Sequence, residues 1–309
     1  MEAATFCMFI HAQPGLTTSN CVPVADCNLK HLSQMKILIL SDLHLELGPF
    51  SSINLCPDVD VVVLAGDIKE SATQAVQWAR NEPAFKHAKA IIFVPGVLEH
   101  WSSFPRDAVA EMRQAAAGSN VHILDSSELV VLGVRFLGLT LWSNCELPVE
   151  TSVGPLSNPQ LSMHVERAMM ADFFQTVSTL PHFVDETGDG KPMPTPEQSL
   201  WLHRASTSWL SQKLSEPFAG KTVVVSHHAP HRNCVDGYFS DDWTTPAAVT
   251  DLPEAYFDVP SLWIHGHVCG GVEHRVKNCR VIANPRGYAR GRRLFIKNLS
   301  FDSSRTVLL

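Results

Sequence analysis

The 309-residue sequence contains no apolar run approaching the roughly 18 residues that a membrane-spanning helix needs. It has no lysine- and arginine-rich tract, and its formal net charge is −7, so the backbone of a nucleic acid is not an expected partner. Its eight cysteines include no Cys-x-x-Cys pair, which indicates reduced thiols and not a disulfide framework. Hydrophobic residues make up 45% of the chain, enough for a sizeable core. We therefore expect a soluble, cytoplasmic, globular protein with no membrane partner.

Residues 1–34 read differently from the rest of the chain. Glu2 lies where a signal peptide would carry positive charge, and no small-residue cleavage site follows cleanly. Met35 then opens an apolar segment with the pattern of a buried strand. We expect 1–34 to be a dispensable N-terminal leader, or an over-called start, and 35–309 to be the functional domain.

Short apolar runs alternate with helical stretches along this domain, which predicts sheets covered by helices. The predicted strands are Lys36–Leu40, Val59–Leu64, Ala90–Val94, Leu129–Leu132, Arg135–Leu141, Thr222–Val225, Leu262–Ile264, Val272–Val276, Val281–Ala283 and Leu294–Ile296. The predicted helices are Ser71–Arg80, Asp107–Ala117, Ser162–Val177 and Pro196–Leu214. Long connections are expected at 143–160, 181–196 and 231–259. The pattern favours one α/β domain of two stacked sheets with helices outside.

Residue types that bind metals follow five of the predicted strands. The segments at the strand ends are Ser41-Asp42-Leu43-His44, Ala65-Gly66-Asp67, Gly96-Val97-Leu98-Glu99-His100, Ser226-His227-His228 and His265-Gly266-His267-Val268-Cys269. Side chains gathered at one edge of a sheet from separate strand ends form a binding site. Histidine, aspartate and cysteine together are the ligands of a transition-metal site.

This ordered set resembles the calcineurin-like metallophosphoesterase family, over roughly residues 35–290. The segment Asn284-Pro285-Arg286-Gly287-Tyr288 is similar to bacterial members of that family. The resemblance implies a four-layer αββα sandwich of two mixed sheets with flanking helices. It also implies a dinuclear metal site at the strand ends, holding two divalent ions of Mn, Fe or Zn.

For the first metal, the resemblance implies Asp42 and His44 as ligands, with Asp67 bridging to the second metal. Cys269 stands where the family has the second histidine of Gly-His-x-His. A thiolate ligand favours Zn or Fe over Mn. Cys269 is equally well explained as a small buried hydrophobic residue.

For the second metal, the resemblance implies Asp67, His227 and His267 as ligands. Three protein ligands plus water match a catalytic zinc site. We predict Asp67 and His228 as catalytic residues. The alternative for His227 and His228 is a pair of core histidines at a strand end.

The third motif departs from the family. Gly-Asn-His supplies a metal ligand and a histidine that contacts the scissile phosphate, whereas this chain has Gly96-Val97-Leu98. Neither valine nor leucine donates a lone pair or a proton. His265 is a possible substitute ligand, and His100 a possible substitute for the missing acid. Arg286 is either a phosphate contact or a solvated loop residue.

The predicted function is hydrolysis of a small phosphate mono- or diester, with metal-bound hydroxide as nucleophile. The alternative is a catalytically impaired or inactive member of the same fold that acts as a scaffold or binding protein. A metallo-β-lactamase-like or amidohydrolase enzyme is disfavoured, because neither His-x-His-x-Asp-His nor an early His-x-His is present. The residues indicate neither the natural substrate nor an oligomeric state.

Overall fold

The computed structural model describes residues 34–48, 50, 58–100, 105–166, 168, 196–235, 237–268, 270–290 and 294–309. All of them belong to one compact unit, Gln34–Leu309. The predicted leader and the later part of the helix expected at Ser162–Val177 lie outside the described residues, so both stay predictions. In the part of the chain described, no helix combines the length and apolarity that a bilayer crossing demands.

The first sheet has five strands in the order β13-β1-β2-β3-β4. They span Lys36–Leu40 (β1), Val61–Leu64 (β2), Ala90–Phe93 (β3), Val121–Ile123 (β4) and Thr306–Leu308 (β13). β1 to β4 pair in parallel, and β13 joins the edge of β1 antiparallel. The sheet is therefore mixed, and the carboxyl ends of its central strands meet at one edge.

The second sheet has six strands in the order β5-β6-β7-β8-β10-β9. They span Ser127–Val131 (β5), Val134–Leu139 (β6), Thr222–Ser226 (β7), Leu262–His265 (β8), Val272–Val276 (β9) and Cys279–Ala283 (β10). The four inner strands are parallel, and β5 and β9 are antiparallel edges. A separate two-stranded ribbon pairs β11 (Gly287–Arg290) with β12 (Leu294–Lys297).

The two sheets pack face to face because their strands are apolar on both faces. In β1, Ile37 and Ile39 join the apolar cluster between the sheets, whereas Leu38 and Leu40 join the cluster on the other face. The second sheet fills the shared layer from its own side with residues such as Phe136 and Val225. This period-two alternation places one hydrophobic layer between the sheets and one on each outer face.

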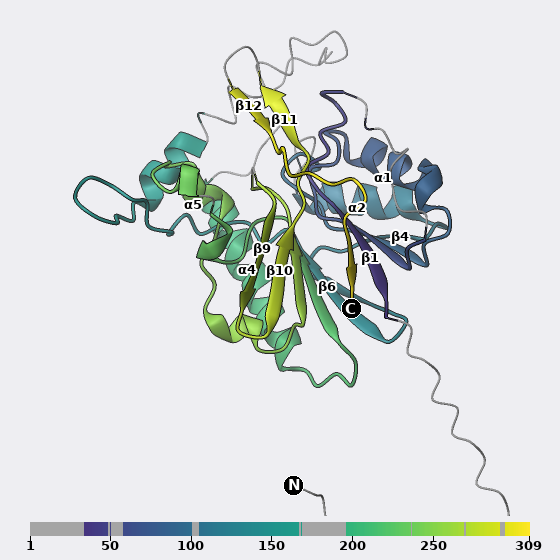
Figure 1. The fold of residues 1–309 in the computed structure, drawn as a ribbon. Helices are drawn as coiled ribbons and strands as arrows, with labels where there is room; N and C mark the ends of the chain where they lie inside the picture. Colours follow the sequence, from purple (N-terminus) through teal and green to yellow (C-terminus); the bar gives the residue numbers. More distant parts are fainter. Residues whose placement is uncertain are drawn as a thin grey trace, which may run out of the picture. The chain divides into compact units, whose positions relative to one another are not determined.

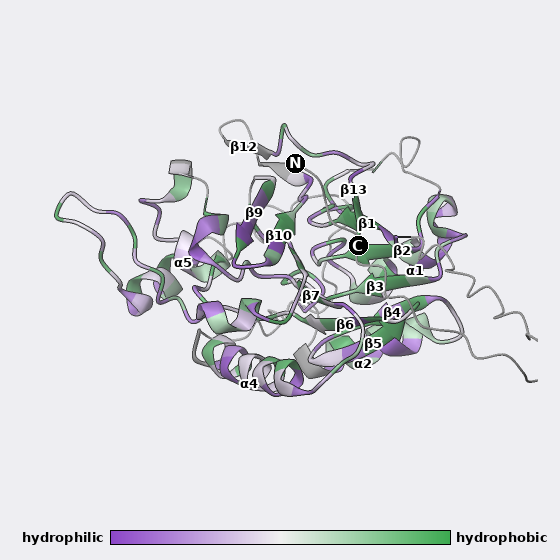
Figure 2. Ribbon diagram, turned by 60° about the horizontal axis from the view of Figure 1, so that its bottom comes forward, coloured by the Kyte–Doolittle hydropathy of each residue, from purple (hydrophilic) through white to green (hydrophobic). Residues whose placement is uncertain are grey.

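Helices cover the outer faces (Figure 1). α1 (Ala72–Asn81) and α2 (Pro105–Ala116) pack on the first sheet; α1 buries Ala72, Ala75, Val76 and Ala79, which are spaced for one helical face. α4 (Pro196–Ser215) packs on the second sheet through Leu210. Figure 2 shows the hydrophobic colouring concentrated in the strands, while α4 mixes both characters. The four-layer αββα sandwich is thereby confirmed.

The connections carry short helical turns that the sequence does not signal. They are η1 (Pro83–Phe85), η2 (Arg232–Cys234), η3 (Gly237–Phe239), α5 (Thr245–Ala248) and η4 (Glu254–Phe257). Four of the five lie in the connection expected at 231–259. The described part of that segment is therefore folded and packs against the second sheet, with Phe257 fully buried.

Candidate metal centre

The loops that follow neighbouring strands stay hydrogen-bonded to each other beyond the strand ends. After β1 and β2, the amide of Asp42 donates to the carbonyl of Gly66 (2.9 Å), and that of His44 donates to the carbonyl of Asp67 (3.2 Å). After β7 and β8, the amide of Gly266 donates to the carbonyl of His227 (3.0 Å). The sheets therefore deliver the loops in register, and the predicted ligands arrive at one edge.

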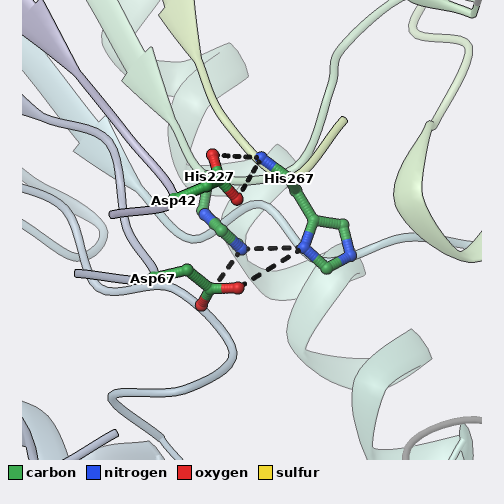
Figure 3. A group of neighbouring side chains, drawn as sticks. All are labelled: Asp42, Asp67, His227 and His267. Carbon is green, nitrogen blue, oxygen red and sulfur yellow. Dashed lines mark hydrogen bonds and ion pairs between the residues drawn. The ribbon is translucent and has the colours of Figure 1, made fainter. Parts of the chain in front are cut away.

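Four of the predicted ligands meet there: one donor atom from each of Asp42, Asp67, His227 and His267 lies within 4.8 Å of the others (Figure 3). Nε2 of His227 lies 3.5 Å from Oδ1 of Asp67 and 2.9 Å from Nδ1 of His267. Both Oδ atoms of Asp42 accept from the amide of His267 at 3.1 Å. Two carboxylates and two imidazoles from four separate strand ends thus face one point.

The backbone at this edge adopts a conformation that ordinary side chains rarely occupy. Asp42, His44, Asp67 and His267 have φ angles of 50°, 47°, 54° and 64°, in the left-handed region. Non-glycine residues are held there only where the surroundings enforce it, and such residues gather at functional sites.

Three glycines leave the space that the cluster fills. A Cβ on Gly66 would meet the His227 ring at Nδ1, and one on Gly96 would meet the amide and carboxylate of Asp67. A Cβ on Gly266 would lie 2.7 Å from Oδ2 of Asp42. Each of these positions therefore requires glycine so that the ligating side chains can pack together.

Asp67 and His227 form a strongly coupled pair. Burial alone would raise the pKa of Asp67, but the adjacent His227 lowers it well below its usual value. Burial alone would lower the pKa of His227, but the Asp67 carboxylate raises it to about 9. For Asp42, burial outweighs the nearby histidines and raises the pKa of its carboxyl. The protonated His227 ring thus balances the charge of the buried Asp67 carboxylate, a role that a bound cation would take over.

His44 is buried beside the group of four but is not a member of it. Its Nδ1 lies 3.0 Å from Oε1 of Glu46, whose side chain is also buried. Burial would lower the pKa of His44, and the hydrogen bond with Glu46 raises it above the usual value. A carboxylate on Nδ1 fixes the tautomer in which Nε2 carries the lone pair, as is usual for histidines that bind metals.

Glu99 is a residue of the site that the sequence analysis missed. Its fully buried carboxylate accepts hydrogen bonds from the backbone amides of Asp67 (2.9 Å), Ile68 (2.8 Å), Lys69 (3.1 Å) and Gly96 (2.7 Å). Burial, followed by the charge of Asp67, raises the pKa of Glu99 to about 7. Glu99 therefore ties together the loops after β2 and β3.

The altered third motif is buried. Val97 and Leu98 are 3% and 2% exposed, and neither has a polar side-chain atom. The backbone amide of Leu98 nevertheless donates to Oδ1 of Asp67 at 2.8 Å. The loop therefore still orients Asp67, although its side chains bring no donor.

The predicted catalytic residue His228 lies next to the cluster. Its ring centroid is 4.5 Å from that of His267 and 5.6 Å from that of Trp142. Burial, followed by His267 and His227, lowers the pKa of His228 well below its usual value.

The substitute ligand His265, the substitute acid His100 and the phosphate contact Arg286 are not among the four grouped donor residues. His265 pairs with Ala283 of β10 and donates from Nδ1 to the carbonyl of Gly266; burial lowers the pKa of His265 to about 4. His100 bonds through Nε2 to the hydroxyl of Thr140 (3.0 Å). Arg286 donates to the carbonyl of Leu43 (2.8 Å), so it braces the loop after β1. The predicted ligand Cys269 lies outside the described residues.

The donor set fits a divalent transition metal. Carboxylate oxygen and imidazole nitrogen suit Mn, Fe and Zn. His227 donates from Nδ1 to the carbonyl of Ala65 (2.9 Å), which turns its Nε2 lone pair towards Asp67 and His267.

Comparisons with known proteins agree with this geometry. A family model described as calcineurin-like phosphoesterase matches residues 35–271. The crystal structure of phosphopantetheinyl hydrolase (PptH) from Mycobacterium tuberculosis is similar to the chain, with 16% identity and a TM-score of 0.58, over 83% of this chain and 90% of that one. At that identity the likeness shows the fold alone.

Two further solved structures match less well. A proposed 5′-nucleotidase from Staphylococcus aureus in complex with alpha-ketoglutarate has 12% identity and a TM-score of 0.36, over 81% of this chain and 48% of that one. GAP50, the anchor in the inner membrane complex of Plasmodium, has 13% identity and a TM-score of 0.34, over 86% and 76%. These scores are too low to support an argument. The search of curated proteins finds no significant match.

Proposed function

The chain belongs to the calcineurin-like phosphoesterase family, and from this premise we propose that it hydrolyses a phosphate mono- or diester at a dinuclear metal centre. The observation that carries the proposal is the group of four donor residues at the strand ends, Asp42, Asp67, His227 and His267. When bound, two divalent ions supply an activated water and a clamp for the phosphoryl oxygens.

The first ion would be held by Asp42, His44 and Asp67, with Cys269 as the fourth ligand. Glu46 supports this assignment, because its contact with Nδ1 of His44 (3.0 Å) presents the opposite nitrogen for ligation. If the Cys269 thiolate ligates, Zn or Fe is favoured over Mn.

The second ion would be held by Asp67, His227 and His267. Asp67 lies against both of these histidines: its Oδ1 is 3.5 Å from His227, and its Oδ2 is 3.9 Å from His267. Because a carboxylate has two oxygens to share, Asp67 would also bridge to the first ion. Its orientation is fixed by the amide of Leu98 and by Glu99.

Asp67 and His228 are the proposed catalytic residues. Asp67 acts by holding both ions in place. His228 is buried against His267, beside the donor group, and would contact a metal or a bound phosphate.

The altered third motif predicts which esters are hydrolysed best. Without the histidine that Leu98 replaces, the leaving group receives no general-acid assistance, which is worth roughly 10²–10⁴-fold. The leaving group of an aryl phosphate departs without protonation, so the hydrolysis rate of these esters falls little. We therefore propose a preference for esters with good leaving groups.

The proposed partner is a small phosphate ester in the cytoplasm. The net charge of −7 gives no support for a nucleic-acid backbone as partner. Cys145, Cys234 and Cys279, the cysteines in the part of the chain described, are buried free thiols, which suits a reducing compartment.

The test is turnover of p-nitrophenyl phosphate and bis(p-nitrophenyl) phosphate after chelation and readdition of Mn, Zn or Fe. We expect activity that chelation removes, that metal restores, and that Asp67→Asn abolishes. Asp258→Asn is the matched control, because Asp258 pairs with Lys277 at the surface. Activity that survives both chelation and Asp67→Asn would contradict the proposal.

The alternative, an inactive member that serves as a scaffold, is motivated by Val97 and Leu98, whose apolar side chains are buried at the site. Metal content separates the two functions. A scaffold that purifies without metal and takes none up would replace the hydrolase proposal.

A further inference from the structure

The chain turns sharply after β7, so that two successive histidines face the same region. In a continuing strand, His227 and His228 would point to opposite faces of the sheet. Their ring centroids are instead 5.3 Å apart with planes at 89°, and the His228 ring lies 4.5 Å from that of His267. Three imidazoles are therefore grouped at the metal centre.

The orientation of the His228 ring is fixed by its surroundings. Nδ1 lies 3.2 Å from the carbonyl oxygen of Thr140, and the backbone amide of His228 donates to the same oxygen. Its own carbonyl accepts from the Ser226 hydroxyl (2.8 Å), which in turn accepts from the Trp263 indole (2.9 Å). The ring also packs against Trp142. These contacts leave it little rotational freedom.

The Thr140 contact determines which nitrogen carries the lone pair. A carbonyl oxygen only accepts, so Nδ1 must carry the hydrogen, and in the neutral ring Nε2 has the lone pair. His227 shows the same arrangement, with Nδ1 donating to the carbonyl of Ala65. A hydrogen bond from the far nitrogen to a backbone carbonyl is the usual support of a metal-ligating histidine.

The proposed centre has one metal-ligating side chain fewer at the second ion than the family motif supplies. Val97 occupies the place of the asparagine that the family motif supplies to the second ion, and its side chain is buried and apolar. Asp67, His227 and His267 alone would leave that ion with three protein ligands. An additional nitrogen from an adjacent, rigid ring would complete a set of four.

We propose that His228 ligates the second metal ion through Nε2 and supplies the donor that Val97 cannot. The inference rests on the proposed dinuclear centre. His228 is not one of the four residues whose donor atoms lie within 4.8 Å of one another. His44, the proposed ligand of the first ion, also lies outside that group, so a ligand of this centre need not belong to it.

The test measures metal binding and does not depend on turnover. The whole chain is stripped of metal and titrated with Co²⁺, with stoichiometry from elemental analysis, affinity from competition with a chromophoric chelator, and coordination from the visible spectrum. We expect the unaltered chain to bind two ions. In His228→Ala and His228→Gln, the second ion should bind at least about tenfold more weakly with a changed spectrum, while the first is retained.

Two further variants make the test specific. His231→Ala is the matched control, because His231 is a nearby buried histidine whose ring packs on Phe257; both ions should bind as in the unaltered chain. Val97→Asn introduced into His228→Ala should restore the affinity of the second ion, since it returns an oxygen donor to the centre. A purely structural role of His228 predicts no such rescue.

The outcomes separate the two proposals. If the unaltered chain binds two ions and both His228 variants match its affinity and spectrum, the His228 inference is wrong and the dinuclear centre stands. If the unaltered chain binds no ion, the proposed function fails and the inference fails with it.

Discussion

The backbone amide of Leu98 donates a hydrogen bond to the carboxylate of Asp67 at 2.8 Å. This contact uses a main-chain atom, so it does not depend on which side chain stands at position 98. The third motif therefore has apolar side chains at positions 97 and 98 but still holds Asp67 through its backbone. This explains how the site retains its geometry with Val97 and Leu98 in place.

We predict that Glu99→Gln weakens both the fold and metal binding. Each oxygen of Glu99 accepts from two backbone amides, and an amide nitrogen at either place would leave two buried N–H groups without an acceptor. Each such group costs about 1–3 kcal/mol. We expect the free energy of unfolding to fall by about 2–6 kcal/mol in denaturant titrations, and Mn binding to weaken.

Glu82→Gln is the matched control for Glu99→Gln. Glu82 is also buried, but its carboxylate accepts from a single backbone amide, that of Ala84, and glutamine keeps an oxygen for it. If both variants lose the same small amount of stability, Glu99 does not organise the loops as described.

We predict that Gly96→Ala impairs the metal centre more than the fold. The added Cβ would press on the Asp67 carboxylate and the His227 ring, and overpacking of this kind costs about 1–3 kcal/mol. Calorimetric titration should show metal affinity reduced at least about tenfold. Gly237→Ala is the control, since a Cβ there meets nothing within 4 Å. Unchanged affinity in Gly96→Ala would contradict the close packing.

We predict a pH-dependent stabilisation by Glu166→Gln. Burial raises the pKa of Glu166 to about 7, from an ordinary value of 4.5. Between these values the folded chain holds a proton that the unfolded chain has released, so stability falls as pH rises. Glutamine does not titrate, so the Glu166→Gln variant does not lose this stability as pH rises.

Thermal unfolding from pH 4 to 8 checks the Glu166 prediction. The Tm advantage of Glu166→Gln should be smallest at pH 4 and grow through pH 7. Glu111→Gln, which changes an exposed carboxylate on α2, should show no such trend. A constant offset across the range would mean that the Glu166 carboxyl is not perturbed by burial.

Local pattern predicts the layers of this fold well because their strands are buried on both faces. Lys36–Leu40 and Val272–Val276 match β1 and β9 residue for residue, and Pro196–Leu214 matches α4 to within one residue at its C-terminal end. The sequence pattern does not predict β4, β11 or β13. β4 and β13 have three residues each, too few to show a period, and each forms because a neighbouring strand offers an open edge. β11 pairs only with β12 among the described residues.

The candidate ligands could be predicted because aspartate and histidine residues follow the ends of several predicted strands. Glu99 and Glu46 could not be assigned in the same way. Glu99 acts on backbone amides about 30 positions earlier, and Glu46 acts through the ring of His44. Such roles depend on tertiary contacts to main-chain atoms and to other side chains, which leave no residue pattern. The sharp turn that brings His228 beside His267 also depends on tertiary contacts, so no residue pattern predicts it.

The most direct test of the central claim is hydrolysis of bis(p-nitrophenyl) phosphate with added Mn, Zn or Fe, comparing the unaltered chain with a Val97→Asn/Leu98→His variant. We predict that the unaltered chain turns over and that chelation stops it. The variant should gain little on this aryl ester and roughly 10²–10⁴-fold on an alkyl phosphate, because it regains general-acid assistance. Activity of the variant alone would identify an impaired enzyme, and inactivity of both would show that this fold serves a function other than phosphoester hydrolysis.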